Sequence, residues 1–269
     1  MTEPVSQKEV DLYLTTEWLG RILYTERELE STNLRAKELI NQATPEGTVV
    51  YAEVQTKGRG RWGREWYSPE ELGLWFSVIL NPAVFEPTPQ GVVWLGCFAV
   101  QSAVEKLFDV SLKIRWPNDL YFMRKKCCGF LAEYNQSSGR SGSMVLGIGI
   151  NVNQTMNDFP DHLRAEAISM RMITGRKIDR SFLFAEILNQ LEYHFNRVVS
   201  EGSDWLYQKW IALSDMLDQS VVLRVRENTI TGRVAGFERD GKLIIRNNSG
   251  GFQSFGDGEV LEVKDVTGH

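Results

Sequence analysis

The sequence predicts a mixed α+β domain, in which helices pack on a largely antiparallel sheet, followed by a small SH3-like β-barrel. Strand-sized apolar runs follow one another between residues 48 and 150 and are separated by helical patterns, which is typical of helices packed on one sheet. From residue 220 onward the runs become shorter, and turn pairs such as Asp240-Gly241 divide them, which is typical of a small barrel. We therefore divide the chain into residues 1–216 and 217–269.

Local signals place the individual elements. Ser31 and Thr32 are good N-cap residues for a helix over Leu34–Ile40, and Val10–Leu23 is a short amphipathic stretch expected to pack at a domain edge. Longer apolar and amphipathic runs predict helices at Val92–Phe108, Leu183–Val199 and Trp205–Leu213. Strands are expected at Thr48–Gln55, Leu72–Leu80, Leu112–Trp116, Leu120–Met123, Gly129–Tyr134 and Met144–Ile150, and in the barrel at Val221–Arg226, Thr229–Phe237, Lys242–Arg246, Gly251–Phe255 and Val260–Val263.

The composition excludes several classes of protein. The formal net charge of −5 is not that of a protein that coats nucleic acid. The longest apolar stretches are strand-sized and the N-terminus does not resemble a signal peptide, so we expect a cytoplasmic enzyme without a membrane partner. The three cysteines, Cys97, Cys127 and Cys128, fit neither a disulfide framework nor the spacing of zinc ligands. We interpret Cys127 and Cys128 as small core residues.

The segment Gln55–Trp66 is the most informative in the chain. It lies between two predicted strands and is therefore a loop. Its glycines allow the backbone to approach a ligand closely, and its arginine side chains can bracket a phosphate or a carboxylate. A solvated turn or an RNA-contacting Arg-Gly segment is the alternative interpretation of this loop alone. The residues concerned are Gly58, Arg59, Gly60, Arg61, Gly63 and Arg64.

A second polar cluster lies at the end of a predicted strand. Pro117 forces a turn, at which Asn118 and Asp119 present short polar side chains. The hairpin that follows should return Lys126 close to these two residues, where a lysine can neutralise negative charge between a carboxylate and an α-phosphate. An ordinary Asx turn with a basic hairpin tip is the alternative, and we prefer it for Lys125.

Four segments stand out along the chain: Glu30-Ser31-Thr32-Asn33, Gly58-Arg59-Gly60-Arg61-Trp62-Gly63-Arg64, Trp116-Pro117-Asn118-Asp119 and Gly147-Ile148-Gly149-Ile150-Asn151. In this order they resemble the biotin–protein ligase family, and the resemblance spans about residues 20 to 265. A further element, Lys–x–x–Gly–Ile–Leu–x–Glu in the family, appears here as Lys126–Glu133 with Phe130 in place of isoleucine. Glycine inside a strand often marks a place where a ligand lies against the backbone, which suits the last of the four segments.

The resemblance implies a role for each matching position and a class II synthetase-like form of the fold. It implies that residues 1–216 bind biotin and ATP, that Lys126, Arg59 and Asp119 are catalytic, and that Asp119 is a candidate Mg²⁺ ligand. The biotin-binding residues it implies are Ser31, Thr32, Asn33, Gln55, Gly58, Arg59, Arg61, Lys126, Gly129 and Gly147. The ATP-binding residues it implies are Arg59, Arg61, Arg64, Trp66, Asn118, Lys126 and Asn151.

The same resemblance implies the reaction and the partners. Members of the family use ATP and Mg²⁺ to convert biotin to biotinyl-5′-AMP and then biotinylate a lysine of a biotin carboxyl carrier domain of a carboxylase. A homodimer is a further expectation from the family. About 30 residues precede Ser31, too few for the N-terminal helix-turn-helix of repressor-type members, so we expect no DNA binding.

The chain departs from the family at a few positions, and two other functions fit parts of it. Arg115 stands where the family often has lysine, Cys127-Cys128 replaces residues without sulfur, and no aromatic near Ala167–Met170 matches the adenine-stacking tryptophan of some members. A lipoate or octanoate ligase or transferase of the same fold is the first alternative, although those proteins lack the Arg-Gly loop. A non-enzymatic nucleic-acid-binding module is the second, and the net charge argues against it.

Overall fold

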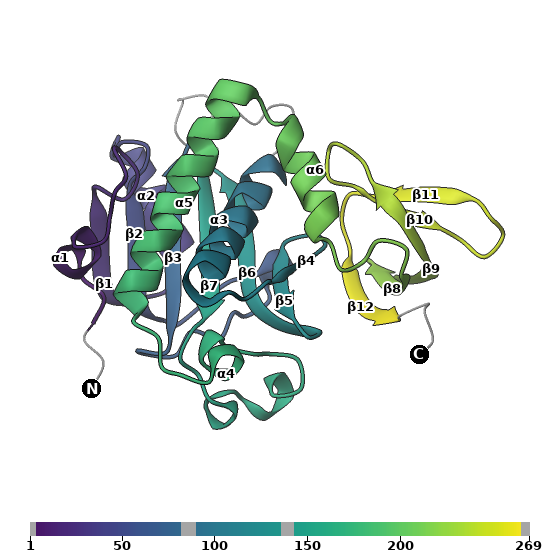
Figure 1. The fold of residues 1–269 in the computed structure, drawn as a ribbon, viewed down its shortest axis with the longest axis horizontal. Coiled ribbons are helices and arrows are strands. Elements are labelled where there is room, and N and C mark those ends of the chain that lie inside the picture. The colour runs from purple at the N-terminus through teal and green to yellow at the C-terminus, as the bar shows by residue number, and fades with distance from the viewer. Residues whose placement is uncertain (1–3, 82–89, 136–142, 265–269) are drawn as a thin grey trace.

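The computed structural model describes residues 4–81, 90–135 and 143–264, and its largest element is a seven-stranded sheet (Figure 1). The strands lie in the order β1-β2-β3-β7-β6-β5-β4, and all neighbouring pairs are antiparallel except β1–β2. The prediction of a mixed, largely antiparallel sheet is therefore confirmed. The strands are β1 (Leu23–Leu29), β2 (Val49–Gln55), β3 (Gly73–Leu80), β4 (Lys113–Arg115), β5 (Asp119–Phe122), β6 (Lys125–Tyr134) and β7 (Met144–Asn151).

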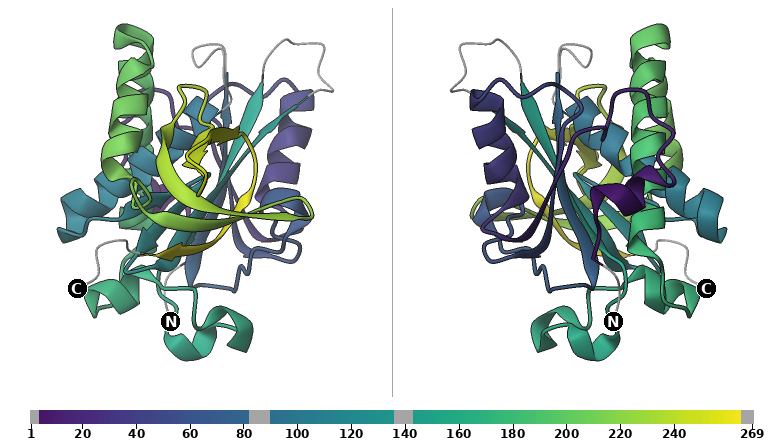
Figure 2. Two further views of the ribbon diagram at one scale, coloured as in Figure 1. Left: turned by 90° about the vertical axis from the view of Figure 1, so that its right-hand side faces the viewer. Right: turned by 90° about the vertical axis from the view of Figure 1, so that its left-hand side faces the viewer.

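Helices cover both faces of this sheet (Figure 2). α3 (Gln90–Phe108) and α5 (Arg180–Glu201) pack against each other on one face, where the main hydrophobic core lies. α2 (Thr32–Asn41) lies on the opposite face, where its buried apolar residues form a second cluster with Val50 and Val145. The shorter helices are α1 (Gln7–Asp11), α4 (Met170–Thr174) and α6 (Asp204–Leu213).

The helix α3 corrects one expectation from the sequence. Within the described residues it is long and apolar enough to cross a membrane by length and composition, so the apolar runs of this chain are not all strand-sized. However, 72% of its most apolar window is buried inside the protein. A helix that is apolar on all sides and covered by neighbouring elements is typical of a protein core.

The C-terminal residues form a second sheet beside α6 (Figure 1). Its strands lie in the order β11-β10-β9-β8-β12, and each neighbouring pair is antiparallel. Within residues 220–264 the edge strands β11 and β12 are not paired with each other, so we describe a five-stranded sheet where the sequence predicted a barrel. The strands are β8 (Ser220–Val225), β9 (Asn228–Phe237), β10 (Leu243–Arg246), β11 (Phe252–Phe255) and β12 (Glu259–Lys264).

The N-terminal region and the connection between the sheets add detail that the sequence did not provide. The predicted amphipathic stretch Val10–Leu23 contains only the end of α1, followed by turns, and β1 begins at Leu23. The predicted division between residues 216 and 217 falls in the connection between α6 and β8, and it stays a prediction. Buried side chains of both sheets belong to one continuous core.

Candidate active site

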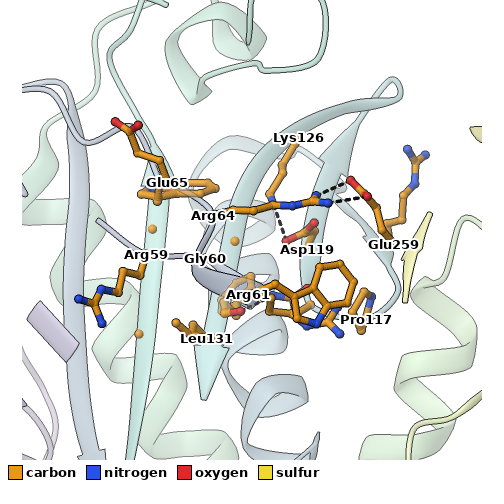
Figure 3. A pocket seen from close by; sticks show the side chains of 18 of the residues that line it. Arg59, Gly60, Arg61, Arg64, Glu65, Pro117, Asp119, Lys126, Leu131 and Glu259 are labelled. Carbon is orange, nitrogen blue, oxygen red and sulfur yellow. Dashed lines mark hydrogen bonds and ion pairs between the residues drawn. The ribbon is translucent and has the colours of Figure 1, made fainter. Parts of the chain in front are cut away.

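A cavity of about 480 Å³ lies between the seven-stranded sheet, the loop after β2 and the C-terminal sheet. Figure 3 shows side chains from these elements converging on it. The sequence-predicted residues that line it are Ser31, Thr32, Asn33, Gln55, Arg59, Arg61, Arg64, Trp66, Asn118, Asp119, Lys126, Gly129 and Gly147. The structure thus brings together segments that are far apart in the chain.

The hairpin of β5 and β6 positions Lys126 beside Asp119, as predicted. Its turn residues Met123 and Arg124 both have positive φ, and the two strands pair Tyr121 with Lys126. The Lys126 ammonium forms an ion pair with Asp119 Oδ1 at 2.8 Å and lies 5.2 Å from the centre of the Trp66 ring. The Lys126 backbone N–H donates to Glu166 O at 2.7 Å, which fixes the start of β6 against the 166–168 segment.

Polar side chains form one end of the cavity around the start of α2. The backbone N–H and the hydroxyl of Thr32 both donate to Gln55 Oε1, at 2.9 and 3.1 Å. Ser77 donates to Asn33 Oδ1 at 2.6 Å, and the Asn33 amide N–H donates to Glu133 at 2.7 Å. These bonds hold amide and hydroxyl groups in fixed orientations at one end, as recognition of a polar ring requires.

Glycines on the same face of the sheet make room for this end and for Trp66. A Cβ at Gly147 would lie 2.2 Å from Asn33 Oδ1, and one at Gly149 would lie 2.4 Å from Trp66 Nε1. Gly129 is paired with Gly149 across β6 and β7, and a Cβ there would meet the Trp66 ring at 2.9 Å. The glycine backbone is therefore the floor on which the indole and the asparagine amide lie.

The C-terminal sheet holds the arginine loop through several polar contacts. Arg61 forms an ion pair with Asp257 and donates to Gly258 O at 3.2 Å. The Trp62 indole, on a residue with φ of 56°, donates to Asp257 Oδ2 at 2.9 Å. Arg61 and a second loop arginine, Arg64, lie over the Trp62 ring, at 4.6 and 5.3 Å from its centre. The residues that follow the Asp257-Gly258 turn therefore form part of the cavity wall.

Glu259 connects the loop with the hairpin electrostatically. It accepts a hydrogen bond from Arg64 Nη2 at 2.6 Å and pairs with Arg224 at 3.4 Å. The Arg64 hydrogen bond lowers the pKa of Glu259, and the charges of Arg64, Arg224 and Lys126 lower it further. Burial lowers the pKa of Arg61, and the negative charge of Asp119 opposes that effect. Glu259 is thus an ionised counter-charge to the cations around it.

Arg59 points in a different direction from the other loop arginines. Figure 3 shows its guanidinium directed away from the Lys126–Asp119 pair. Its positive charge contributes to lowering the pKa values of Glu30 and Glu133, which lie toward the α2 end. Its catalytic role stays a prediction, and that role requires the side chain to turn toward Lys126.

Two predicted ligand-binding residues do not line the cavity. Gly58 shapes the loop, because a Cβ there would lie 2.5 Å from Trp66 O. Asn151 is buried, donates to Ile168 O at 3.2 Å and accepts from Gln154 at 3.3 Å. Both residues support the walls in this structure, and their direct contact with a ligand stays a prediction. Cys127 and Cys128 are fully buried, as expected of core residues.

Several cavity residues were not found from the sequence. Arg115 stacks on Tyr121 at 3.9 Å and pairs with Asp215, and Arg124 and Glu166 also line the wall. Arg115 and Arg124 flank recognised motifs, and Arg115 stands where the family often has lysine, whereas no recognised motif lies beside Glu166. The C-terminal contributors had no motif at all. These are Arg224, Gly258, Glu259, Val260 and Leu261.

Comparison with known proteins agrees with this fold. Residues 24–151 match the biotin/lipoate A/B protein ligase family. The bifunctional ligase/repressor BirA of Bacillus subtilis is 36% identical over 247 residues, which are 91% of this chain and 76% of that protein. The biotin–[acetyl-CoA-carboxylase] ligase of Mycobacterium tuberculosis is 32% identical over 153 residues, which are 55% of this chain and 53% of that protein. A structure of the Aquifex aeolicus biotin protein ligase with biotin and ATP has a TM-score of 0.77 at 31% identity, covering 89% of this chain and 97% of that one.

The chain belongs to the biotin/lipoate A/B protein ligase family. Within that family its sequence and its fold group it with the biotin–protein ligases, and it is an enzyme of that class.

Proposed function

We propose that this ligase activates biotin with MgATP to biotinyl-5′-AMP and then transfers the biotinyl group to a lysine of an acceptor protein. The observation that carries the proposal is the single cavity in which the polar α2 end, the Lys126–Asp119 pair and the arginine loop meet. Its polar end suits the ureido ring of biotin, and its cationic end suits a nucleotide triphosphate.

The first step joins two anions, so the residues around it must offset their repulsion. A biotin carboxylate oxygen forms a bond to the α-phosphorus, while the bond between that phosphorus and the bridging oxygen breaks and pyrophosphate leaves with the electron pair. Lys126 lines the same cavity as the polar end and the arginine loop, so its ammonium can stabilise charge on both reacting groups. The loop around Arg61 and Trp66 can cover the reactive anhydride and exclude water.

The second step requires a neutral amine. The acceptor lysine attacks the carbonyl carbon of the anhydride, an amide bond forms, and AMP leaves. Asp119 lies beside Lys126 with an ionisable carboxylate on the cavity wall, so it is our candidate to orient the incoming amine or accept its proton.

The residues present fit a magnesium ion that arrives with the nucleotide. In the described part of the chain, no group of three or more histidine, cysteine, aspartate or glutamate side chains is placed to hold a metal ion. Magnesium commonly binds substrate phosphates and waters with only one or two protein carboxylates, and Asp119 lines the cavity as such a carboxylate. Bound there, the ion would neutralise phosphate charge.

Replacing Lys126 tests the first step directly, and its neighbour provides the control. Lys126→Ala should slow biotin-dependent pyrophosphate release by about 10²–10³-fold, because the charge that bridges both reactants is lost. Lys125 points its ammonium toward Arg164 O at 3.4 Å and does not line the cavity, so Lys125→Ala should retain near-normal release. Near-normal release by Lys126→Ala would remove this residue from the mechanism.

We further propose a biotin carboxyl carrier domain of a carboxylase as the acceptor, a cytoplasmic location and a homodimer. The name of the Mycobacterium tuberculosis relative supports a carboxylase acceptor. A lipoate or octanoate substrate is the competing proposal. Biotin with MgATP should raise the melting temperature of the protein far more than lipoate with MgATP does, because only a ligand that binds the folded state stabilises it.

A further inference from the structure

We infer that Arg224, on the C-terminal sheet, binds the β- and γ-phosphates of ATP and stabilises the departing pyrophosphate. The inference rests on the proposed function and adds a residue from outside the large sheet to the active site. None of the sequence motifs contains Arg224, which lies on β8 and became a candidate only through its position on the cavity wall.

The first observation is the position of Arg224 opposite Glu259. The two residues are register partners on β8 and β12, and their side chains form an ion pair at 3.4 Å. The same carboxylate holds Arg64 Nη2 at 2.6 Å. One glutamate therefore keeps two guanidinium groups, one from the loop and one from the C-terminal sheet, beside the same part of the cavity.

The second observation is the charge of the cavity wall. Seven cationic side chains line it, against four carboxylates: Arg59, Arg61, Arg64, Arg115, Arg124, Lys126 and Arg224 face Glu65, Asp119, Glu166 and Glu259. This excess of positive charge fits a polyanion such as the triphosphate chain. A small carboxylate substrate alone would need far less of it.

The third observation is the position of these groups along β6 and the C-terminal sheet. The polar end lies at Leu131, whose carbonyl accepts a hydrogen bond from Asn33, whereas Lys126 lies nearer the start of the same strand, beside Asp119. The charge of Lys126 in turn acts on Glu259, the residue that holds Arg64 and Arg224. If the α-phosphorus meets the biotin carboxylate at Lys126, the rest of the triphosphate extends toward Arg64 and Arg224.

This position gives Arg224 a chemical role. When the bond between the α-phosphorus and the bridging oxygen breaks, the pyrophosphate takes the electron pair and gains negative charge. A guanidinium fork can hold two phosphate oxygens and stabilise that charge. Glu259 keeps the fork oriented, and the phosphates compete with this carboxylate for Arg224.

The chain offers a matched control in Arg233. Arg233 lies on the neighbouring strand β9, is 51% exposed against 52% for Arg224, and forms a similar ion pair, with Asp218 at 3.5 Å. It does not line the cavity. A general effect of removing a surface arginine from this sheet would appear equally in both variants.

The experiment measures biotin-dependent kinetics and direct binding of inorganic pyrophosphate for wild type, Arg224→Ala, Arg224→Lys and Arg233→Ala. We expect Arg224→Ala to raise the KM for MgATP and the Kd for pyrophosphate by on the order of tenfold, ~1.4 kcal/mol, with the KM for biotin unchanged. Arg224→Lys should recover part of the loss, and Arg233→Ala should behave as wild type.

The inference would be overturned by an unchanged KM for MgATP and Kd for pyrophosphate in Arg224→Ala, or by equal changes in Arg233→Ala. A parallel rise of both KM values with a lower melting temperature would also overturn it, because that indicates structural damage. Failure of the proposed function looks different, since the wild-type protein would then show no biotin-dependent turnover of ATP.

Discussion

Replacing Gly147 with alanine tests whether the glycine floor positions the polar end of the cavity. The new Cβ would lie 2.2 Å from Asn33 Oδ1 and 3.0 Å from Asn33 Nδ2. A Cβ atom essentially never lies within 3.0 Å of such a heavy atom, so the Asn33 amide must withdraw. That amide is held by Ser77 at 2.6 Å and by Glu133 at 2.7 Å, and a shift that removes the clash breaks or weakens both hydrogen bonds.

The size of the effect follows from these two bonds. A neutral hydrogen bond contributes about 0.5–1.5 kcal/mol, and one to a carboxylate about 1.5–3 kcal/mol. We therefore expect a loss of at least about 2 kcal/mol in biotin affinity, which is roughly a 30-fold rise in Kd. The loss should appear in biotin binding because Asn33 and its neighbour Thr32 shape the end of the cavity where we place the ureido ring.

Isothermal titration calorimetry with biotin measures this change, and urea unfolding reports any loss of stability. The control is Gly256→Ala, where the nearest atom to the new Cβ is Lys242 Cγ at 3.7 Å and no clash arises. Gly256→Ala should bind biotin as the wild type does. A Gly147→Ala protein with wild-type affinity for biotin would refute the placement of biotin against Asn33.

Three further predictions concern stability and the loop. Burial lowers the pKa of His194 to about 3 in the folded protein, whereas the unfolded chain keeps the ordinary pKa of 6.5. Between these two values the unfolded state binds more protons than the folded state, so the free energy of unfolding falls as the pH drops below 6.5. By pH 5 the free energy of unfolding should have fallen by about 2 kcal/mol. Urea midpoints at pH 7 and pH 5 measure this fall, which should be absent from His194→Gln. Arg180→Met leaves the buried carboxylate of Glu53 without its ion-pair partner, so the free energy of unfolding in urea should fall by about 3–5 kcal/mol. Adding Glu53→Leu to this variant should restore part of that stability, because the unpaired charge is then removed. Trp62→Ala removes the hydrogen bond to Asp257 and should accelerate tryptic cleavage in the loop several-fold, and an unchanged cleavage rate would show that this bond does not restrain the loop.

The sequence predicted the large sheet well because its central strands are buried on both faces. β3 and β7 consist of fully buried residues, so their nearly continuous apolar runs were readable without any tertiary information. β1 was missed for the opposite reason. It is an edge strand whose residues Thr25 to Glu28 are all exposed, and its parallel pairing with β2 is not encoded in an apolar pattern.

The candidate site was predictable only where it is built from local motifs. The turn at Asn118 and the hairpin returning to Lys126 are short-range features, and the structure places Lys126 beside Asp119 as expected. The contribution of the C-terminal sheet is long-range, since Trp62 and Asp257 are 195 residues apart in the chain. The packing of Trp66 on Gly129 and Gly149 was equally invisible, because it depends on strand register.

The most direct test of this account is native mass spectrometry of the protein incubated with biotin and MgATP. We expect a bound species with the mass of biotinyl-5′-AMP, formed only when both substrates are present and lost when the Lys126→Ala protein is used. Two results would contradict the assignment of this cavity to biotin activation. One is the absence of this species from the wild-type protein, and the other is the formation of a lipoyl adenylate in equal amount when lipoate is supplied in place of biotin.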